Sequence, residues 1–203
     1  MFKKIRPDTF KELVMNVFML LSEFDPAEFS FSDGVDGSKI IASTTGGVTF
    51  ADELETVDDG EDIDNCDKET MELKRIQSRR VHISGNFVTV NAILAALLMA
   101  AVDVDDEDEN HLIPRDDLKT SDFNELWGIA DYGKGGIIAI KMKRVLNTSG
   151  FSISTTDQAK AQFAFDFVCH KTIADPTDPP YEVYLLTPEE EEEEEEVEET
   201  ETT

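Results

Sequence analysis

The residues of this chain best suited to metal binding or nucleophilic chemistry are three histidines and two cysteines. His82, His111 and His170 are scattered, with no His-x-x-x-His pair, and no two cysteines stand at the spacing of a zinc site. His82 and His170 fall on the polar faces of expected strands and are interpreted as surface or interface residues. Cys66 and Cys169 are expected to be free thiols in a reducing cytoplasm, where disulfides are rare. No metal site is predicted.

Two glycine-containing motifs and one acidic run also fail the tests for chemistry. Ser84 is not a nucleophile elbow, because no glycine precedes it at the required spacing and no helix follows directly. Gly133–Gly136 lacks the phosphate-loop pattern and is interpreted as a hairpin turn. Residues 103–109 are rich in carboxylates, but the glycine and distant glutamate of a calcium-binding hand are not in place, which favours a solvent-exposed loop. The sequence therefore predicts neither an enzyme nor a cofactor.

Charge is the most distinctive property of the chain. It has 45 acidic and 18 basic residues, which give a formal net charge of −27 and a pI near 4.2. Such a balance argues against tight binding of nucleic acid or of anionic membranes, which both depend on lysine and arginine. The longest apolar run, Ala92–Val102, is well short of the roughly 20 residues that a membrane-spanning helix needs. No membrane partner is expected.

The elements that would carry these groups are mostly strands. Residues 161–170 alternate, with Phe163, Phe165, Phe167 and Cys169 directed to one face, as in a strand with an aromatic buried side. A segment at 10–22 could be a helix or a strand, and 28–50 reads as short strands and tight turns. Further strands are expected at 79–90, 123–132, 137–146 and 181–186.

One helix is expected, from Ala92 to about Ala101, with Asn91 as its N-cap. It is apolar nearly all round, so it should be packed. On the strand at 137–146 the alternation directs Ile138, Ile140 and Met142 to the core, with the lysines 141 and 143 facing out. The fold class predicted is mainly β, as one domain over residues 1–186. Residues 187–203 form a poly-Glu tail that should be disordered.

Segments along much of the chain carry a resemblance to a known family. These segments are Thr44–Val48, Gly60–Cys66, His82–Val90, Pro114–Leu118, Asp122–Trp127, Gly136–Ile140, Asn147–Phe167 and Pro180–Tyr184. In this order and spacing they resemble the major tail tube proteins of long-tailed, siphovirus-type bacteriophages, in the form met in prophages of Gram-positive bacteria. The resemblance covers about residues 40–186 and leaves out the poly-Glu tail.

The resemblance implies a β-sandwich or barrel flanked by a helix, with six copies per ring and rings stacked into the tail tube of a virion. It implies assembly in the host bacterial cytoplasm, with further copies, a tape measure protein, and tail-tip and terminator proteins as partners. Double-stranded DNA would pass through the lumen without specific binding, so the channel wall is expected to be net negative. The family has no catalytic site to transfer.

Opposite charges in separate parts of the chain could make a contact between copies. A head-to-tail stack repeats one heterologous contact, in which one surface must complement another. Residues 51–70 are acidic and expected to form a long loop, and such loops are usually functional. The basic counterpart is expected either at Lys3, Lys4 and Arg6 or on the strand at 137–146. The candidate interface residues are Asp58, Asp59, Glu61, Asp62, Asp64, Lys141, Lys143 and Arg144.

Two other functions compete with a self-assembling conduit. One is a different virion part, such as a tail-completion or capsid-decoration protein. The other is an acidic binding module that does not assemble, for example a DNA mimic. Size under native conditions separates them, because only the conduit should polymerise or form rings.

Overall fold

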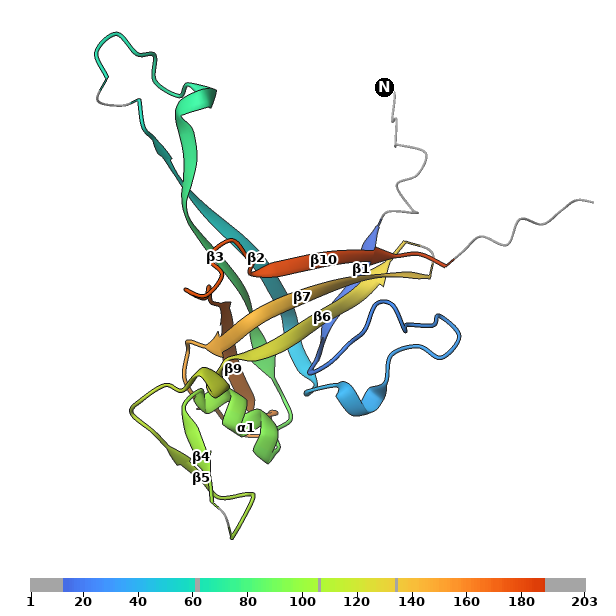
Figure 1. Ribbon diagram of the computed structural model, residues 1–203. Coiled ribbons are helices and arrows are strands. Elements are labelled where there is room, and N and C mark those ends of the chain that lie inside the picture. Colours follow the sequence, from blue (N-terminus) through green and yellow to red (C-terminus); the bar gives the residue numbers. More distant parts are fainter. Residues whose placement is uncertain (1–12, 61–62, 106, 134, 189–203) are drawn as a thin grey trace, which may run out of the picture.

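The computed structural model describes residues 13–60, 63–105, 107–133 and 135–188, and within them the chain is mainly β (Figure 1). One antiparallel sheet of eight strands is accompanied by a two-stranded hairpin, one α-helix and three 3-10 turns. The strands are β1 (Val14–Leu21), β2 (Thr44–Asp58), β3 (Lys74–Phe87), β4 (Val102–Val104), β5 (Leu112–Pro114), β6 (Asn124–Tyr132), β7 (Gly136–Asn147), β8 (Ile153–Ser154), β9 (Gln162–Cys169) and β10 (Tyr181–Leu186). The helices are α1 (Ala92–Met99) and the 3-10 turns Gly37–Lys39, Met71–Leu73 and Thr120–Asp122.

The expected strands at 123–132, 137–146, 161–170 and 181–186 are confirmed as β6, β7, β9 and β10. The segment at 10–22, for which helix and strand both stood open, contains the strand β1. On β9 the aromatic alternation is confirmed, because Phe163, Phe165 and Phe167 are buried. Phe165 stacks on Phe87 of the neighbouring strand β3, with ring centroids 4.3 Å apart. Each such ring contributes about 1.5–3 kcal/mol when removed from water.

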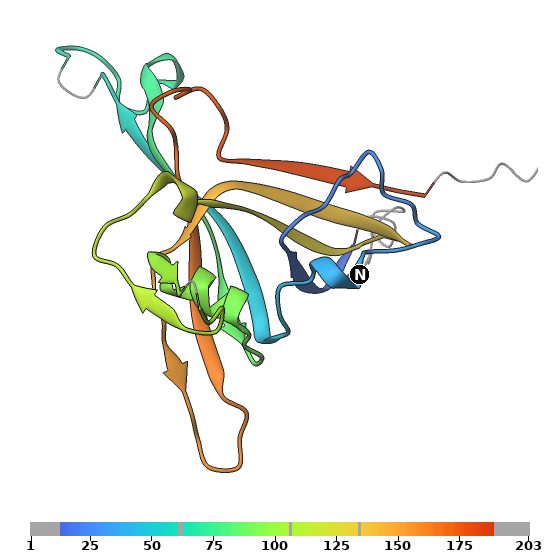
Figure 2. The ribbon, with the colours of Figure 1, turned by 60° about the horizontal axis from the view of Figure 1, so that its bottom comes forward.

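Strand β7 links two halves of the sheet. Its first half pairs with β6 on one edge and with β10 on the other, and β1 continues the sheet beyond β6. Its last residues, Val145–Asn147, pair instead with β9, which leads on to β3 and β2. Figures 1 and 2 show β10, β7 and β6 running across β2 and β3 rather than beside them. The sheet is thus bent at β7, and its two halves share one core.

That core is a cluster between the two halves and helix α1. Its fully buried members are Leu20, Ile83, Phe87, Leu94, Leu98, Met142, Val145 and Phe167. Gly128 of β6 faces this core, where a Cβ on it would lie at an ordinary van der Waals distance of 3.6 Å from Cδ1 of Ile83 on β3. The core therefore holds strands that are far apart in the sheet order.

A second apolar cluster lies on the opposite face of β6 and β7. It contains Leu21, Trp127, Ile129, Ile137 and Ala139, covered by aromatic residues of the segment after β1. The expectation that only Ile138, Ile140 and Met142 of this strand face a core was therefore incomplete. Ile137 and Ala139 are buried as well, because β7 is covered on both faces.

The expected helix is confirmed over Ala92–Met99, shorter than the predicted span. The Asn91 side chain caps it by accepting a hydrogen bond from the Leu94 N–H at 2.7 Å. Ala100 ends it with a φ of 65°. The helix is only partly packed, since Ile93 is 79% exposed. The acidic run at 103–109 is not a plain loop, because β4 and β5 pair around it as a hairpin.

The expectation of a disordered acidic tail falls on residues 187–203, of which residues 189–203 lie outside the described residues. Both cysteines are free, as expected.

Asn147, at the end of β7, is the buried polar residue of the core and is 3% exposed. Its side-chain amide donates to the backbone carbonyls of Leu98 at 2.7 Å and Gly150 at 3.0 Å. Its side-chain oxygen accepts from the backbone N–H of Asp166 at 2.9 Å. One side chain thereby joins the end of α1, the turn after β7 and strand β9.

Replacing this amide should destabilise the fold. Asn147→Ala would remove the side-chain partner of the Leu98 carbonyl and of the Asp166 N–H, and one of two donors to the Gly150 carbonyl. Each unsatisfied buried group costs about 1–3 kcal/mol. The expected result is a urea unfolding midpoint well below that of the parent protein. Thr155→Ala, at an exposed position, is the matched control. An Asn147→Ala midpoint equal to the control would show that the network does not hold these elements together.

Candidate assembly surface

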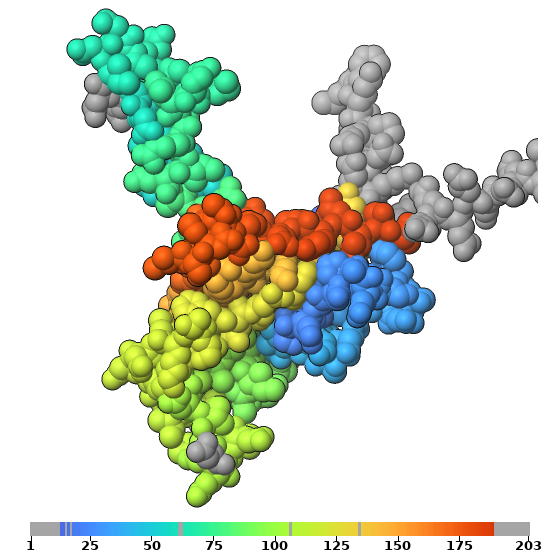
Figure 3. Space-filling view, viewed as in Figure 1, coloured from blue at the N-terminus to red at the C-terminus, as the bar shows by residue number. Residues whose placement is uncertain are grey.

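The β2–β3 hairpin extends beyond the sheet as a projecting arm, defined here as residues 53–80. Strand β9 pairs with β3 only from Phe87 to His82, so the rest of the hairpin has no strand beside it. Figures 1 and 3 show the arm standing out from the body of the molecule. An isolated two-stranded hairpin is marginally stable in water, so this length of arm needs support from its own side chains or from a partner.

Large apolar side chains are exposed along the arm. Leu54 and Ile76 are 51% and 52% exposed, and Met71 near the tip is 80% exposed. Ile63 is exposed in the connecting segment as well. A single exposed apolar residue is ordinary, but several on one projecting hairpin make the arm a candidate contact surface.

Charge pairs support the arm itself. Glu53 and Arg80 are direct cross-strand partners, and their side chains form an ion pair. Nearer the tip, Arg75 contacts Asp59 at 2.6 Å, and Lys74 pairs with a glutamate of the connecting segment. These exposed pairs are weak individually, but they fix the register of the two strands.

The prediction of a loop over residues 51–70 is therefore wrong for its first half, since β2 continues to Asp58. Residues 52–59 are acidic and poor in apolar side chains, a composition that is typical of a loop when this segment is considered alone. Residues 74–80 are basic and pair with them across the hairpin. The complementary charge of these two segments is the signal that would have identified the arm.

The acidic candidate residues all belong to the arm. Asp58 accepts hydrogen bonds from the backbone N–H groups of Gly60 at 2.9 Å and Glu69 at 2.8 Å. These bonds lower the pKa of the Asp58 carboxyl. Asp59 is paired with an arginine as described, and Asp64 is exposed. The other two acidic candidates, Glu61 and Asp62, lie outside the described residues.

The basic candidate residues lie on β7 and are neutralised within the chain. Lys141 contacts Glu125 at 3.1 Å and lies over the Trp127 ring. Lys143 contacts Asp178 at 2.9 Å, and Arg144 contacts the same carboxylate at 2.8 Å. They are not brought next to the acidic arm in one copy, and their part in a subunit contact stays a prediction. Lys3, Lys4 and Arg6 lie outside the described residues.

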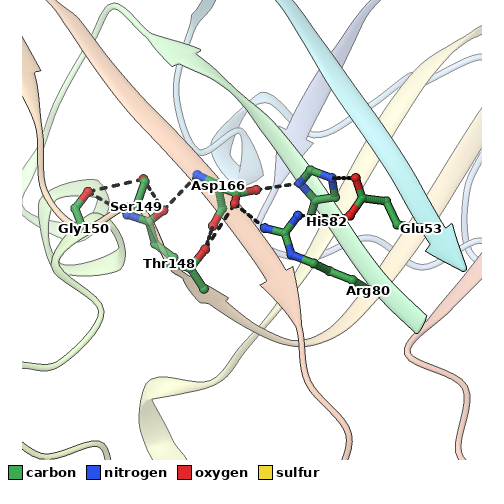
Figure 4. Close-up of polar contacts among 8 residues, drawn as sticks. Glu53, Arg80, His82, Thr148, Ser149, Gly150 and Asp166 are labelled. Atoms are coloured by element: carbon green, nitrogen blue, oxygen red, sulfur yellow. Dashed lines mark hydrogen bonds and ion pairs between the residues drawn. The ribbon is translucent and has the colours of Figure 1, made fainter. Parts of the chain in front are cut away.

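A polar cluster holds the root of the arm against β9 (Figure 4). Asp166 of β9 lies at its centre, with Arg80 Nη2 at 2.7 Å and His82 Nδ1 at 2.7 Å. Thr148 donates its hydroxyl to the same carboxylate at 3.2 Å, and His82 also lies 3.8 Å from Glu53. The sequence predicted a surface or interface residue at His82, whereas its side chain is only 14% exposed and holds β3 to β9.

Burial alone would raise the pKa of Asp166. The hydrogen bond with His82 and the charges of His82 and Arg80 outweigh it, so the pKa of this carboxyl is lowered. On the other face of the root, the Tyr181 hydroxyl donates to Asp52 at 2.9 Å. Both faces of the arm are therefore anchored where it leaves the body.

The root cluster has the components of a catalytic triad but not its geometry. Its hydroxyl, on Thr148, bonds to Asp166, and the carboxylate lies between this hydroxyl and His82. In a catalytic triad the imidazole lies next to the hydroxyl and accepts its proton. Here the carboxylate stands between them, so the imidazole cannot activate the Thr148 hydroxyl as a nucleophile. Among the described residues, no group of three or more acidic, histidine or cysteine side chains is arranged to hold a metal ion.

Comparison with known proteins does not assign the chain to a family. No protein-family model matches the chain, and no curated protein matches it significantly. No helix within the described ranges is long and apolar enough to span a membrane.

The root cluster should make stability depend on pH in a defined direction. Because the folded pKa of Asp166 is lowered, its carboxylate stabilises the fold above the unfolded aspartate pKa of about 3.9, and this contribution is lost as pH falls through the folded pKa. Asp166→Asn should lower the urea midpoint near neutral pH, and the gap to the parent protein should close in acid.

The control for this series is Asp157→Asn, which changes an exposed aspartate in the β8–β9 connection. Its gap to the parent protein should be small at every pH. A gap for Asp166→Asn that stays constant from neutral pH into acid would contradict the assigned ionised role.

Proposed function

We propose that this chain is a structural protein that assembles with copies of itself, and that the assembly is the tail tube of a long-tailed bacteriophage. The finer architecture proposed with it is the tail-tube type of β-sandwich, in hexameric rings that stack around a channel. The surfaces described above support self-assembly, and the resemblance of the sequence segments supports the tail tube. In this proposal the protein belongs to the virion and is built in the bacterial cytoplasm.

The arm is the observation that carries the proposal. A hairpin with exposed Leu54, Ile76 and Met71 gains free energy when another surface covers it. It projects from one side of the body, and in the proposed stack the surface that receives it lies elsewhere on the next copy. Such a heterologous contact repeats without limit along a stack, as a tube requires.

The outer strands of one half of the sheet offer a second contact. Within the described residues, β10 pairs only with β7, and β1 has β6 as its strand partner apart from a single bridge from Leu21 to Ile40. Both strands carry exposed apolar side chains, among them Val14 and Leu185. Strand edges of this kind pair readily with other strands. Pairing β10 of one copy with β1 of the next would close a ring of strands.

The acidity of the chain suits a passage for DNA. Aspartate and glutamate on a channel wall repel phosphate, whereas each exposed lysine or arginine would bind it and slow transit. Ten lysine and arginine side chains of the described residues form ion pairs within the chain, which reduces their attraction for phosphate. The proposed partners beyond further copies are the tape measure, tail-tip and terminator proteins.

Removing the apolar surface of the arm should block assembly without unfolding the subunit. In Leu54→Ser/Ile76→Ser, both changes are at half-exposed positions, so stability should change by about 0.5 kcal/mol or less per site. Burying two such side chains in a contact contributes roughly 2–3 kcal/mol, so the concentration needed for assembly should rise more than about tenfold. Sedimentation velocity and negative-stain microscopy of the concentrated proteins measure this.

The matched control is Ile173→Ser, because Ile173 is 99% exposed and lies outside the arm. It should assemble like the parent protein. A parent protein that stays a monomer at every concentration, and within virions, would refute self-assembly and favour the acidic binding module. A single ring that never stacks would favour a tail-completion or decoration protein instead.

A further inference from the structure

A groove of about 1080 Å³ lies beside helix α1, away from the arm. One wall is the outer side of α1 with Ile93 and Ala96, and the other is the β4–β5 hairpin with Val104. Ile40 and Leu126 contribute further apolar lining, and Glu109 and Glu125 lie among its polar lining residues. Ile93 at 79% exposure is the least covered of these apolar side chains, so the groove offers apolar surface to an occupant.

The walls of the groove are negatively charged overall. From Val102 to Pro114 the sequence contains six acidic residues and no lysine or arginine. Lys39 is the basic residue of the lining, and it is paired with Glu23. A suitable occupant therefore combines apolar side chains with positive charge.

Of the two terminal segments of this chain, the N-terminal one has that combination. The arm tip carries apolar residues but is strongly acidic, and the C-terminal run from residue 189 is almost entirely glutamate and threonine. The β8–β9 connection is polar. Residues 1–12, in contrast, hold Phe2, Ile5 and Phe10 together with four basic and two acidic residues. Three of the four basic residues lie within 3–6.

Residues 1–12 and the groove adjoin opposite ends of strand β1. Residues 1–12 precede β1 at the end where Val14 pairs with Tyr132. The groove adjoins the other end, where Leu21 pairs with Trp127 and bridges to Ile40. The eight residues of β1 separate the two by about 23 Å along the strand. A donor segment and a receptor at opposite ends of one subunit generate a head-to-tail contact.

We propose that residues 1–12 of one copy bind in the α1 groove of the next copy. Phe2 and Ile5 fill the apolar floor beside Ile93, and Lys3, Lys4 and Arg6 face the acidic hairpin. This inference rests on the proposed self-assembly and assigns one of its contacts. It also gives a role to Lys3, Lys4 and Arg6, since the alternative basic group on β7 is already paired within the chain.

Disulfide trapping between two differently tagged full-length proteins tests the proposal. One carries Ile5→Cys and the other Ile93→Cys, and both carry Cys66→Ser to remove the half-buried thiol. Cys169 can stay, because burial raises its pKa to about 12 and leaves almost no reactive thiolate. Under assembling conditions and mild oxidation, the mixed dimer should form about tenfold or more in excess of the control pair, because binding raises the local thiol concentration.

The control pair replaces Ile93→Cys by Ile173→Cys, which is at least as exposed but does not line the groove. Reversing charge with Lys3→Glu/Lys4→Glu/Arg6→Glu should cut the mixed dimer about tenfold, the loss of roughly 1.4 kcal/mol. Adding Glu107→Lys/Glu109→Lys to the partner should restore much of it. A yield unaffected by charge reversal would overturn the proposal.

Two further outcomes separate this inference from the proposed function. A double variant, Ile5→Cys/Ile93→Cys, that links within one chain would show that the segment binds its own groove, which overturns binding between copies. Rings or tubes that form without mixed dimers above the control overturn the groove contact and leave self-assembly standing. Absence of any oligomer from the parent protein overturns both.

Discussion

Strand β7 constrains the whole structure, because one of its edges serves two partner strands in succession. β10 pairs along it up to Met142, and β9 pairs from Val145 onward. Between them the backbone of Arg144 takes a φ of 50°, a conformation that is costly for a side chain of this kind. The carboxylate of Asp178 binds both Lys143 and Arg144 at this point. The ion pairs therefore fix the place where the sheet changes direction and its two halves enclose the core.

The arm follows from this arrangement. Because β9 ends at Cys169, it covers β3 only from Phe87 to His82, and the longer β2–β3 hairpin continues alone. Cross-strand ion pairs such as Glu53–Arg80 then support the exposed strand pair, and the ion pair of Arg80 with Asp166 holds its root to β9. In the proposed assembly, this overhang would reach a neighbouring copy.

Much of the body could be predicted from local patterns. Alternating aromatic residues identified β9, and Asn91 before a run of strong helix formers identified α1. The arm was missed because its pairing depends on charges about twenty residues apart, which no single window contains. The buried role of His82 and the ion pairs of Lys143 were missed for a related reason. Their partners come from strands and loops that only the tertiary structure brings near.

The charge of the chain limits how its copies can attract one another. Each copy carries a formal charge of −27, and like-charged copies repel. Most of the cations in the described part already bind carboxylates of the same chain, so they add little attraction. Screening confines the repulsion to roughly 8 Å at physiological salt. Attraction must therefore act at contact, through apolar side chains such as Leu54 and Ile93 and through strand edges. In the proposed assembly, a contact that brings acidic surfaces together without covering apolar area is disfavoured, so the acidity of the chain would limit the orientations in which copies join.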